Sequence, residues 1–306
     1  MRVLLPIIWH ELTHCIERAF KEQGHETRVV NWRKWEGNPN RVRTEIINAA
    51  TEFQPDLVWC QFQSPHIATP KLVHQLKEVL GCYVVQWVGD VRFPLPQHYI
   101  DLAPHFDVTS FSNRTDVEEI RALGHRSEFL QIGYDERIYN TDNTGERDGV
   151  VFIGNNYGGY KFAESDSRRN MVHALHSAFG DRFTVYGQSW EPYKGQYVRE
   201  PGDALILKRA SIAVGWDHFH RPGFASDRLL RATACGCAVV NQYYEGIEDE
   251  HPHVIAVKTI EEMVESVGEL LADPKRAKEL GELNAANTLK KHRWNERVKI
   301  IEQWML

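Results

Sequence analysis

The stretch Pro222-Gly-Phe-Ala-Ser-Asp-Arg-Leu-Leu-Arg-Ala-Thr-Ala-Cys-Gly-Cys-Ala-Val-Val-Asn-Gln-Tyr-Tyr-Glu-Gly246 decides the fold. Its pattern predicts a loop, a helix, a short apolar strand and a second loop. Ser226 or Asp227 can cap the helix, because a short side-chain oxygen accepts hydrogen bonds from the unpaired N–H groups of a first turn. Gly236 predicts the end of the helix, and residues 237–240 predict the strand. A helix and strand joined in this way are typical of an α/β sheet.

The start of this helix also has features of a phosphate site. Gly223 precedes it, and Arg228 and Arg231 lie in its first two turns. Backbone N–H groups and the helix dipole favour an anion at a helix N-terminus, and guanidinium groups bind phosphate oxygens in pairs. An ordinary core helix explains the spacing equally well, so the residues alone leave both interpretations open.

Composition limits the class of protein. The chain has 306 residues, of which 42% are hydrophobic and 25% charged, with a formal net charge of -6. These values are ordinary for a globular protein of two domains and argue against one coated in nucleic acid. The five cysteines are scattered and odd in number, which favours reduced thiols. No apolar run suits a secretory leader or a membrane span, so we expect a cytoplasmic protein.

Strands and helices alternate along the chain, which predicts parallel sheets with crossover helices. The alternation pauses at residues 141–149, which are polar and rich in turn formers, and restarts with an apolar run at 150–153. We therefore predict an N-terminal Rossmann-like domain at 1–147 and a second one at 148–290. A terminal helix at 291–306 is expected to return to the first domain.

The segment from Gly223 to Val240 resembles the donor-binding segment of GT-B glycosyltransferases of the glycosyl transferases group 1 kind, closest to the spore-maturation-protein-like branch. Segments at 131–140, 151–155, 185–190 and 292–297 are similar to other parts of that family in the same order. The resemblance implies two Rossmann-like domains facing a cleft and a UDP- or GDP-sugar donor. It also implies a mostly retaining transfer to an acceptor hydroxyl, with no obligatory metal or other cofactor.

Two positions depart from the family pattern. The family's ribose-binding Glu falls on Arg231, and the Glu eight residues earlier falls on Gly223. A guanidinium group only donates hydrogen bonds, so it cannot accept from ribose hydroxyls as a carboxylate does. This difference motivates an alternative hypothesis, a non-catalytic GT-B-like protein that binds a nucleotide or a partner.

A glycine-rich turn, Gly154-Asn-Asn-Tyr-Gly-Gly159, opens the second domain and is followed by Lys161. Such turns let backbone N–H groups approach a diphosphate. Gly187 and Trp190 follow the next strand, where they can contact base or sugar, although simple packing also explains the tryptophan. The predicted donor-binding residues are Gly154, Asn155, Lys161, Gly187, Trp190, Ser226, Asp227, Arg228 and Arg231.

Three residues of the first domain are candidates for catalysis. Asp90 follows a strand at 83–88 and resembles the Trp-x-x-Asp segment of the family; it can orient or deprotonate an acceptor hydroxyl, or simply pair with Arg92. His10 and Glu11 follow the first strand and are expected near the acceptor, unless they form a solvated helix start. His10-Glu-Leu-Thr-His14 also matches a zinc-peptidase motif, but the extended form of that motif is absent.

A basic segment with interleaved tryptophans spans residues 28–43 and contains one acid, Glu36. Cations beside aromatic rings suit a phosphorylated or nucleic-acid acceptor, while a solvated basic loop is the plainer interpretation. The predicted acceptor residues are Arg33, Lys34, Arg41 and Arg43. We favour a small molecule or glycan as acceptor over a hydroxylated base in DNA.

Overall fold

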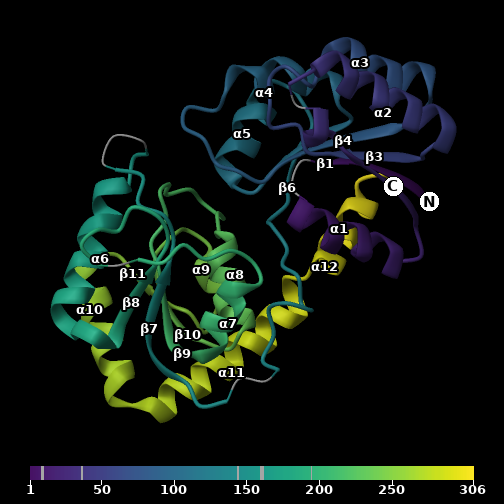
Figure 1. Cartoon of the computed structure of the whole chain (residues 1–306). Helices are drawn as coiled ribbons and strands as arrows, with labels where there is room; N and C mark the ends of the chain where they lie inside the picture. The colour runs from purple at the N-terminus through teal and green to yellow at the C-terminus, as the bar shows by residue number, and fades with distance from the viewer. Residues whose placement is uncertain (8–9, 36, 143–144, 159–161, 194) are drawn as a thin grey trace. The chain divides into compact units, whose positions relative to one another are not determined.

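The computed structural model describes residues 1–7, 10–35, 37–142, 145–158, 162–193 and 195–306, without the side chains of residues 10–13. These residues form two compact units. Unit 1 comprises residues 1–132 and 294–306, and unit 2 comprises residues 133–293. Each unit contains one all-parallel sheet with crossover helices (Figure 1). None of the described helices carries the long apolar run that crossing a bilayer requires.

Unit 1 has a sheet of six strands in the order β2-β1-β3-β4-β5-β6. The strands are β1 Arg2–Ile7, β2 Glu26–Asn31, β3 Leu57–Cys60, β4 Tyr83–Val88, β5 Val108–Phe111 and β6 Ser127–Phe129. The α-helices are α1 His10–Glu22, α2 Pro39–Phe53, α3 Pro70–His74, α4 Gln97–Leu102, α5 Arg114–Ala122 and α12 Trp294–Gln303. Three short helical turns complete the unit, namely η1 Trp32–Trp35, the π-helical η2 Gln75–Val79 and η3 Ala103–His105.

The C-terminal helix α12 packs in unit 1 through an aromatic cluster. The ring of Trp294 lies 6.0 Å from that of Trp59 and 5.4 Å from that of Trp87, edge-on to both. All three side chains are fully buried, and the Trp87 indole N–H donates to the carbonyl of Leu130 at 2.9 Å. Burial of aromatic rings contributes strongly to core stability, so this cluster holds α12 against the sheet.

Unit 2 has a sheet of five strands in the order β11-β10-β9-β7-β8. The strands are β7 Asp148–Ile153, β8 Phe183–Tyr186, β9 Ala210–Gly215, β10 Ala238–Gln242 and β11 Ile255–Val257. The helices are α6 Ser165–Phe179, η4 Gly180–Arg182, α7 Gly202–Arg209, α8 Asp227–Ala234, α9 Ile247–Glu250, α10 Ile260–Ala272 and α11 Pro274–Lys291. The predicted helix and strand around Gly236 are therefore α8 and β10.

The units divide at 132/133 and 293/294 rather than at the predicted 147/148 and 290/291. The difference arises because Tyr139 and Arg147, which precede β7, form hydrogen bonds within unit 2. The Tyr139 hydroxyl donates to the Asp203 carboxylate at 2.9 Å. The Arg147 guanidinium donates to the carbonyl oxygens of Ala210 at 3.0 Å and Leu207 at 3.4 Å. A turn-rich composition indicates exposure, but it does not reveal which unit supplies the hydrogen-bond partners.

Candidate functional site

The carboxyl edge of the unit 2 sheet contains several buried polar atoms. Loops follow β7, β8, β9 and β10 at this edge, where ligands bind in open α/β sheets. Several buried polar atoms in or beside these loops have no hydrogen-bond partner in the part of the chain that the structure describes. They are Arg168 Nη2, Trp216 Nε1, Arg228 Nε, Asn241 Oδ1 and the Tyr244 hydroxyl. Buried polar groups are normally paired, so we interpret this edge as a site that a ligand completes.

The loops after β7 and β8 are joined to each other. The N–H of Gly154 donates to the carbonyl of Tyr186 at 2.8 Å, and the N–H of Asn156 donates to that of Gln188 at 3.0 Å. Gly187 has a φ of +140°, and a Cβ there would lie 2.1 Å from the carbonyl oxygen of Gly154. These two glycines therefore permit close approach of the loops, and the two N–H groups are used within the protein rather than presented to a diphosphate.

Trp190 packs against the loop that follows β7. Its indole N–H donates to the carbonyl of Gly154 at 2.5 Å, and its ring packs edge-on against Phe152 at 6.0 Å. Because the side chain is buried, the prediction that it contacts base or sugar is replaced by the packing interpretation. Asn155 also joins the two loops, since its side-chain oxygen accepts a hydrogen bond from the Gln188 N–H at 2.9 Å. Lys161 lies outside the described residues.

Helix α8 begins at this edge, after Ser226 in the N-cap position. The Ser226 side chain makes no capping hydrogen bond, which corrects the prediction that it satisfies the first turn. Asp227, the first residue of the helix, instead forms an ion pair with Arg231 at 3.1 Å. Gly236 has a φ of +79° after the last turn, as predicted for a glycine that ends a helix. Ser226 therefore does not cap this turn, whereas the Asp227 carboxylate faces the backbone N–H groups of Arg228 and of Asp227 itself.

Arg228 lies in the first turn of α8 and contacts one buried carboxylate. Its Nη2 donates to Asp217 Oδ1 at 2.6 Å, and its side chain is 31% exposed. The Arg168 guanidinium approaches the same oxygen from α6, with Nη2 at 3.9 Å, and is 1% exposed. Two guanidinium groups thus share one carboxylate at the carboxyl edge.

Arg168 also fixes the loop that follows β9. Its Nε donates to the carbonyl of Trp216 at 2.7 Å, and its Nη1 lies 2.5 Å from His218 Nε2. Since a guanidinium only donates, that ring nitrogen is the acceptor and is not protonated. The described residues contain no cluster of three or more metal-ligating side chains. His218 therefore acts here as a hydrogen-bond partner of Arg168.

The pKa values of both arginines reflect their shared position. Burial and the neighbouring Arg228 lower the pKa of Arg168, although Asp217 opposes the change. Burial also works against the charge of Arg228, but Asp217 and Asp227 outweigh it and raise the pKa of that group. Both side chains remain protonated at neutral pH. The cluster can therefore attract an anion under ordinary conditions.

Arg231 is surrounded by a set of carboxylates. It pairs with Asp203 at 2.8 Å, Asp227 at 3.1 Å and Glu200 at 3.4 Å, and its guanidinium lies 4.9 Å from the centre of the Tyr139 ring. These partners raise its pKa against the effect of burial. The prediction that Arg231 contacts the donor is therefore replaced by a structural role, in which it links α8 to α7.

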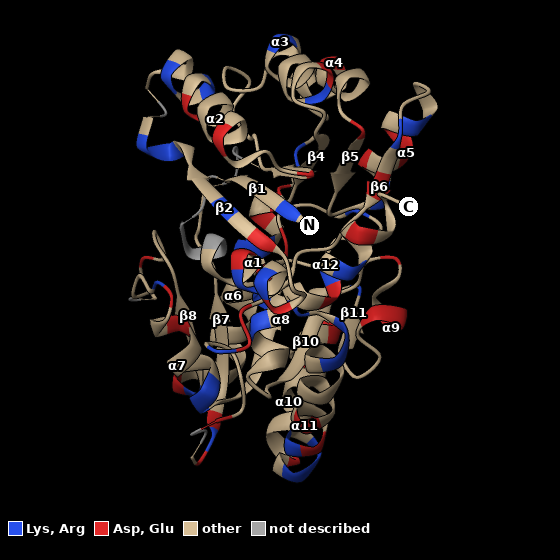
Figure 2. Ribbon diagram, turned by 90° about the vertical axis from the view of Figure 1, so that its right-hand side faces the viewer, with Lys and Arg blue, Asp and Glu red and all other residues tan. Residues whose placement is uncertain are grey.

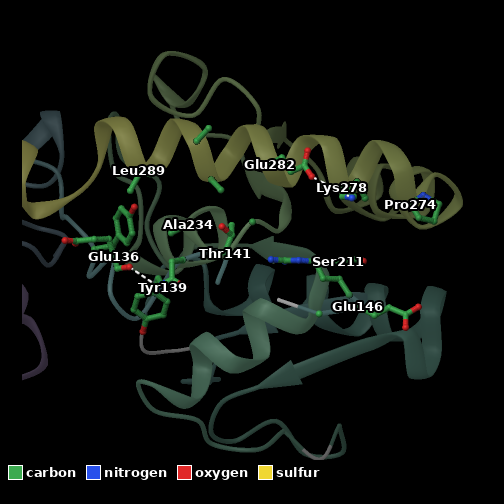
Figure 3. Close-up of a pocket in the computed structure, with 18 residues that line it drawn as sticks. Glu136, Tyr139, Thr141, Glu146, Ser211, Ala234, Pro274, Lys278, Glu282 and Leu289 are labelled. Atoms are coloured by element: carbon green, nitrogen blue, oxygen red, sulfur yellow. Dashed lines mark hydrogen bonds and ion pairs between the residues drawn. The ribbon is translucent and has the colours of Figure 1, made fainter. Parts of the chain in front are cut away.

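A sizeable cavity of unit 2 lies away from this edge. A cavity of about 760 Å³ lies beside α11 (Figure 3). Its lining includes Ser211 at the start of β9, and Ala234 and Gly236 at the end of α8. These residues place it at the amino edge of the sheet, opposite the loops described above. A second cavity, of about 40 Å³, lies between Arg228, Arg231 and Asp203 and has room for ordered water.

In unit 1, the predicted catalytic residues are only partly described. Asp90 lies directly beyond the carboxyl end of β4, and its carboxylate pairs with Arg92 at 3.1 Å. About half of each side chain is exposed, so this is the surface ion pair considered as the alternative. His10 and Glu11 occupy the first turn of α1, but their side chains lie outside the described residues.

The basic segment of unit 1 lies beside acidic residues of β2 and α2, as Figure 2 shows. Arg33 and Lys34 are exposed in η1. Arg41 lies 3.7 Å from Glu45, and Arg43 donates to the carbonyl of His66 at 2.6 Å. Trp32 is fully buried. The segment therefore offers exposed cations, but Trp32 presents no ring on which an extruded base could stack.

Comparisons with known proteins agree with this architecture. Residues 168–303 match the family model described as glycosyl transferase-like. A UDP-forming α,α-trehalose-phosphate synthase from Burkholderia vietnamiensis superposes with a TM-score of 0.66 at 12% identity, over 100% of both chains. Sucrose-phosphate synthase from Thermosynechococcus elongatus gives 0.64 at 11% identity, over 99% of this chain and 98% of the other. The chain has the GT-B fold.

A further GT-B neighbour is an E. coli trehalose-6-phosphate structure with bound UDP-2-fluoro glucose, which gives a TM-score of 0.64 at 10% identity over 99% of both chains. No curated protein matches the sequence. The predicted α/β class with two Rossmann-like domains is confirmed. The narrower resemblance to the spore-maturation branch stays a prediction.

Sequence reasoning assigned no specific donor contact to several groups at the carboxyl edge. Arg168 follows the glycine-rich turn, but its burial depends on the loop after β9, which lies some fifty residues later. Asp217 and Tyr244 each lie two residues after the end of a strand. That position could have marked them in the sequence as candidate ligand contacts, because ligands bind beyond the carboxyl ends of strands in such sheets. Burial raises the pKa of the Tyr244 hydroxyl well above its ordinary value, so it is a hydrogen-bond donor at neutral pH.

Proposed function

We propose that this protein transfers a sugar from a UDP- or GDP-sugar to an acceptor hydroxyl. The GT-B fold and the glycosyl transferase-like match support this class of reaction. The observation that carries the proposal is the positive cluster of Arg228 and Arg168 at the start of α8. A diphosphate is the anion that a nucleotide-sugar would place there.

In this proposal unit 2 holds the donor. Arg228 at the start of α8 binds the diphosphate, while Asn241 and Tyr244 supply further hydrogen bonds at the same edge. Transfer breaks the bond between the sugar's anomeric carbon and the diphosphate oxygen and forms a bond to the acceptor oxygen. The leaving diphosphate gains negative charge, which the guanidinium groups stabilise. We propose that the transfer retains configuration and uses no metal ion.

Unit 1 holds the acceptor in this proposal. Asp90 lies at the carboxyl end of β4, where it can orient or deprotonate the acceptor hydroxyl once its partner Arg92 is displaced. His10 and Glu11 begin α1, which follows the carboxyl end of β1 in the same parallel sheet as β4. We favour a small molecule or a glycan. The exposed Arg33 and Lys34 suit an acceptor that carries a phosphate, while buried Trp32 gives no support to a DNA base.

Donor binding and turnover are separate tests of this proposal. Thermal-shift screening of UDP- and GDP-sugars identifies the donor, and release of UDP or GDP in the presence of candidate acceptors measures turnover. The non-catalytic alternative, motivated by Gly223 and Arg231 at the family's glutamate positions, predicts nucleotide binding with no release of product. The transferase proposal fails if the protein binds the donor but releases no UDP or GDP, by hydrolysis or by transfer, with any of the sugar and glycan acceptors tested.

A further inference from the structure

Asp217 occupies the positive cluster that the proposed donor site needs. Its carboxylate accepts a hydrogen bond from Arg228 at 2.6 Å and lies 3.9 Å from Arg168 Nη2. The side chain is 9% exposed, and its own backbone N–H donates to the side-chain oxygen of Gln242 at 3.1 Å. Asp217 is therefore held by β10 on one side and by two guanidinium groups on the other.

The charges around Asp217 determine what it does to an incoming anion. Of the nearby acids, Asp227 is already paired with Arg231 at 3.1 Å, which leaves Asp217 as the carboxylate in direct contact with Arg228. A phosphate that binds Arg228 comes within a few ångströms of this negative charge, and like charges at such distances repel strongly in a partly buried site. The phosphate must displace the Asp217 carboxylate or bind beside it.

We infer that Asp217 is an internal counter-ion that competes with the donor diphosphate for Arg228 and Arg168 and so sets the affinity of the site. The inference rests on the proposed function, since it assumes that a diphosphate binds at this edge. Without ligand, Asp217 partly compensates the buried Arg168 guanidinium and the partly exposed Arg228 guanidinium. With ligand, it weakens the hold on the diphosphate, which favours release of the nucleoside diphosphate after transfer.

The opposite interpretation makes the opposite prediction. If Asp217 only holds Arg228 in its binding orientation, its removal weakens diphosphate binding. If Asp217 competes, its neutral analogue Asn tightens diphosphate binding and leaves nucleoside binding unchanged, because uridine and guanosine carry no phosphate. The sign of the change therefore separates a positioning role from a competing one.

The experiment is isothermal titration of the whole chain with UDP, GDP, inorganic pyrophosphate, uridine and guanosine. We expect Asp217→Asn to bind the preferred diphosphate at least about fivefold more tightly than wild type, with a steeper loss of affinity as salt is added. Asp273→Asn is the matched control, since Asp273 caps α11 in the same unit through its side chain and Asn retains that role. The control is expected to leave every affinity unchanged.

An unchanged or weaker diphosphate affinity in Asp217→Asn overturns the inference. If wild type binds none of UDP, GDP and pyrophosphate, the proposed donor site itself fails, which is a distinguishable result. If Asp217→Asn does not fold, crystal structures of wild type with and without the bound diphosphate decide. We expect the ligand to break the contact between Asp217 Oδ1 and Arg228 Nη2, and persistence of that contact at 2.6 Å beside the phosphate contradicts the competition.

Discussion

Replacing Arg228 by alanine is the most informative single perturbation of the donor site. The guanidinium has one hydrogen bond to Asp217, a buried Nε–H with no described partner, and a side chain that is 31% exposed. A hydrogen bond to a charged group contributes about 1.5–3 kcal/mol. Partial exposure places the expected loss near the lower part of that range, at about 2 kcal/mol, which corresponds to roughly a 30-fold weaker diphosphate affinity.

The assay is isothermal titration with UDP and GDP, and Arg169→Ala is the matched control. Arg169 follows Arg168 in α6, is about half exposed and pairs with Asp166 on its own helix, so its removal changes the net charge of unit 2 equally. We expect the control to keep the wild-type affinity. Equal affinity in Arg228→Ala and wild type would refute the assignment of the diphosphate to the first turn of α8.

Three further predictions concern stability and cofactor use. Arg231→Ala leaves the buried Asp203 carboxylate without its cation, and we expect a loss of about 3 kcal/mol in unfolding free energy by chemical denaturation; a loss under about 1 kcal/mol would contradict the structural role. Gly187→Ala forces a Cβ against the Gly154 carbonyl at a positive φ, so its melting temperature is expected to fall, and an unchanged value would show that the two loops separate easily. Sugar-transfer activity is expected to be unchanged by EDTA and by the His14→Ala substitution. Loss of activity in both cases would indicate that the His10–His14 motif binds a functional zinc ion.

Local sequence patterns predicted the elements around the candidate site well. Helix α8 and strand β10 followed from an apolar run interrupted by Gly236, because helix ends and buried strands depend on residues close in sequence. The two parallel sheets followed from the repeated alternation of strands and helices, and the GT-B class from the resemblance of the segment Gly223–Val240 to that family. Short elements such as β6 and α9 were missed, since three or four residues are too few to show a period.

The environments of individual side chains were harder to predict. Arg231 was expected to contact the donor, but its carboxylate partners come from Glu200 and Asp203, some thirty residues earlier. Trp190 was expected at a ligand, yet it packs on Phe152 from β7. In both cases tertiary contacts decide whether a polar or aromatic group faces the core or a ligand, and no periodic pattern in the sequence records those contacts.

A crystal structure of the whole chain with UDP or GDP tests the central claim most directly. We predict the diphosphate at the carboxyl edge of the unit 2 sheet, with a phosphate oxygen within hydrogen-bonding distance of Arg228 and of the first-turn N–H groups of α8. A nucleotide found instead in the cavity beside α11, or a diphosphate with no contact to Arg228, would contradict the account.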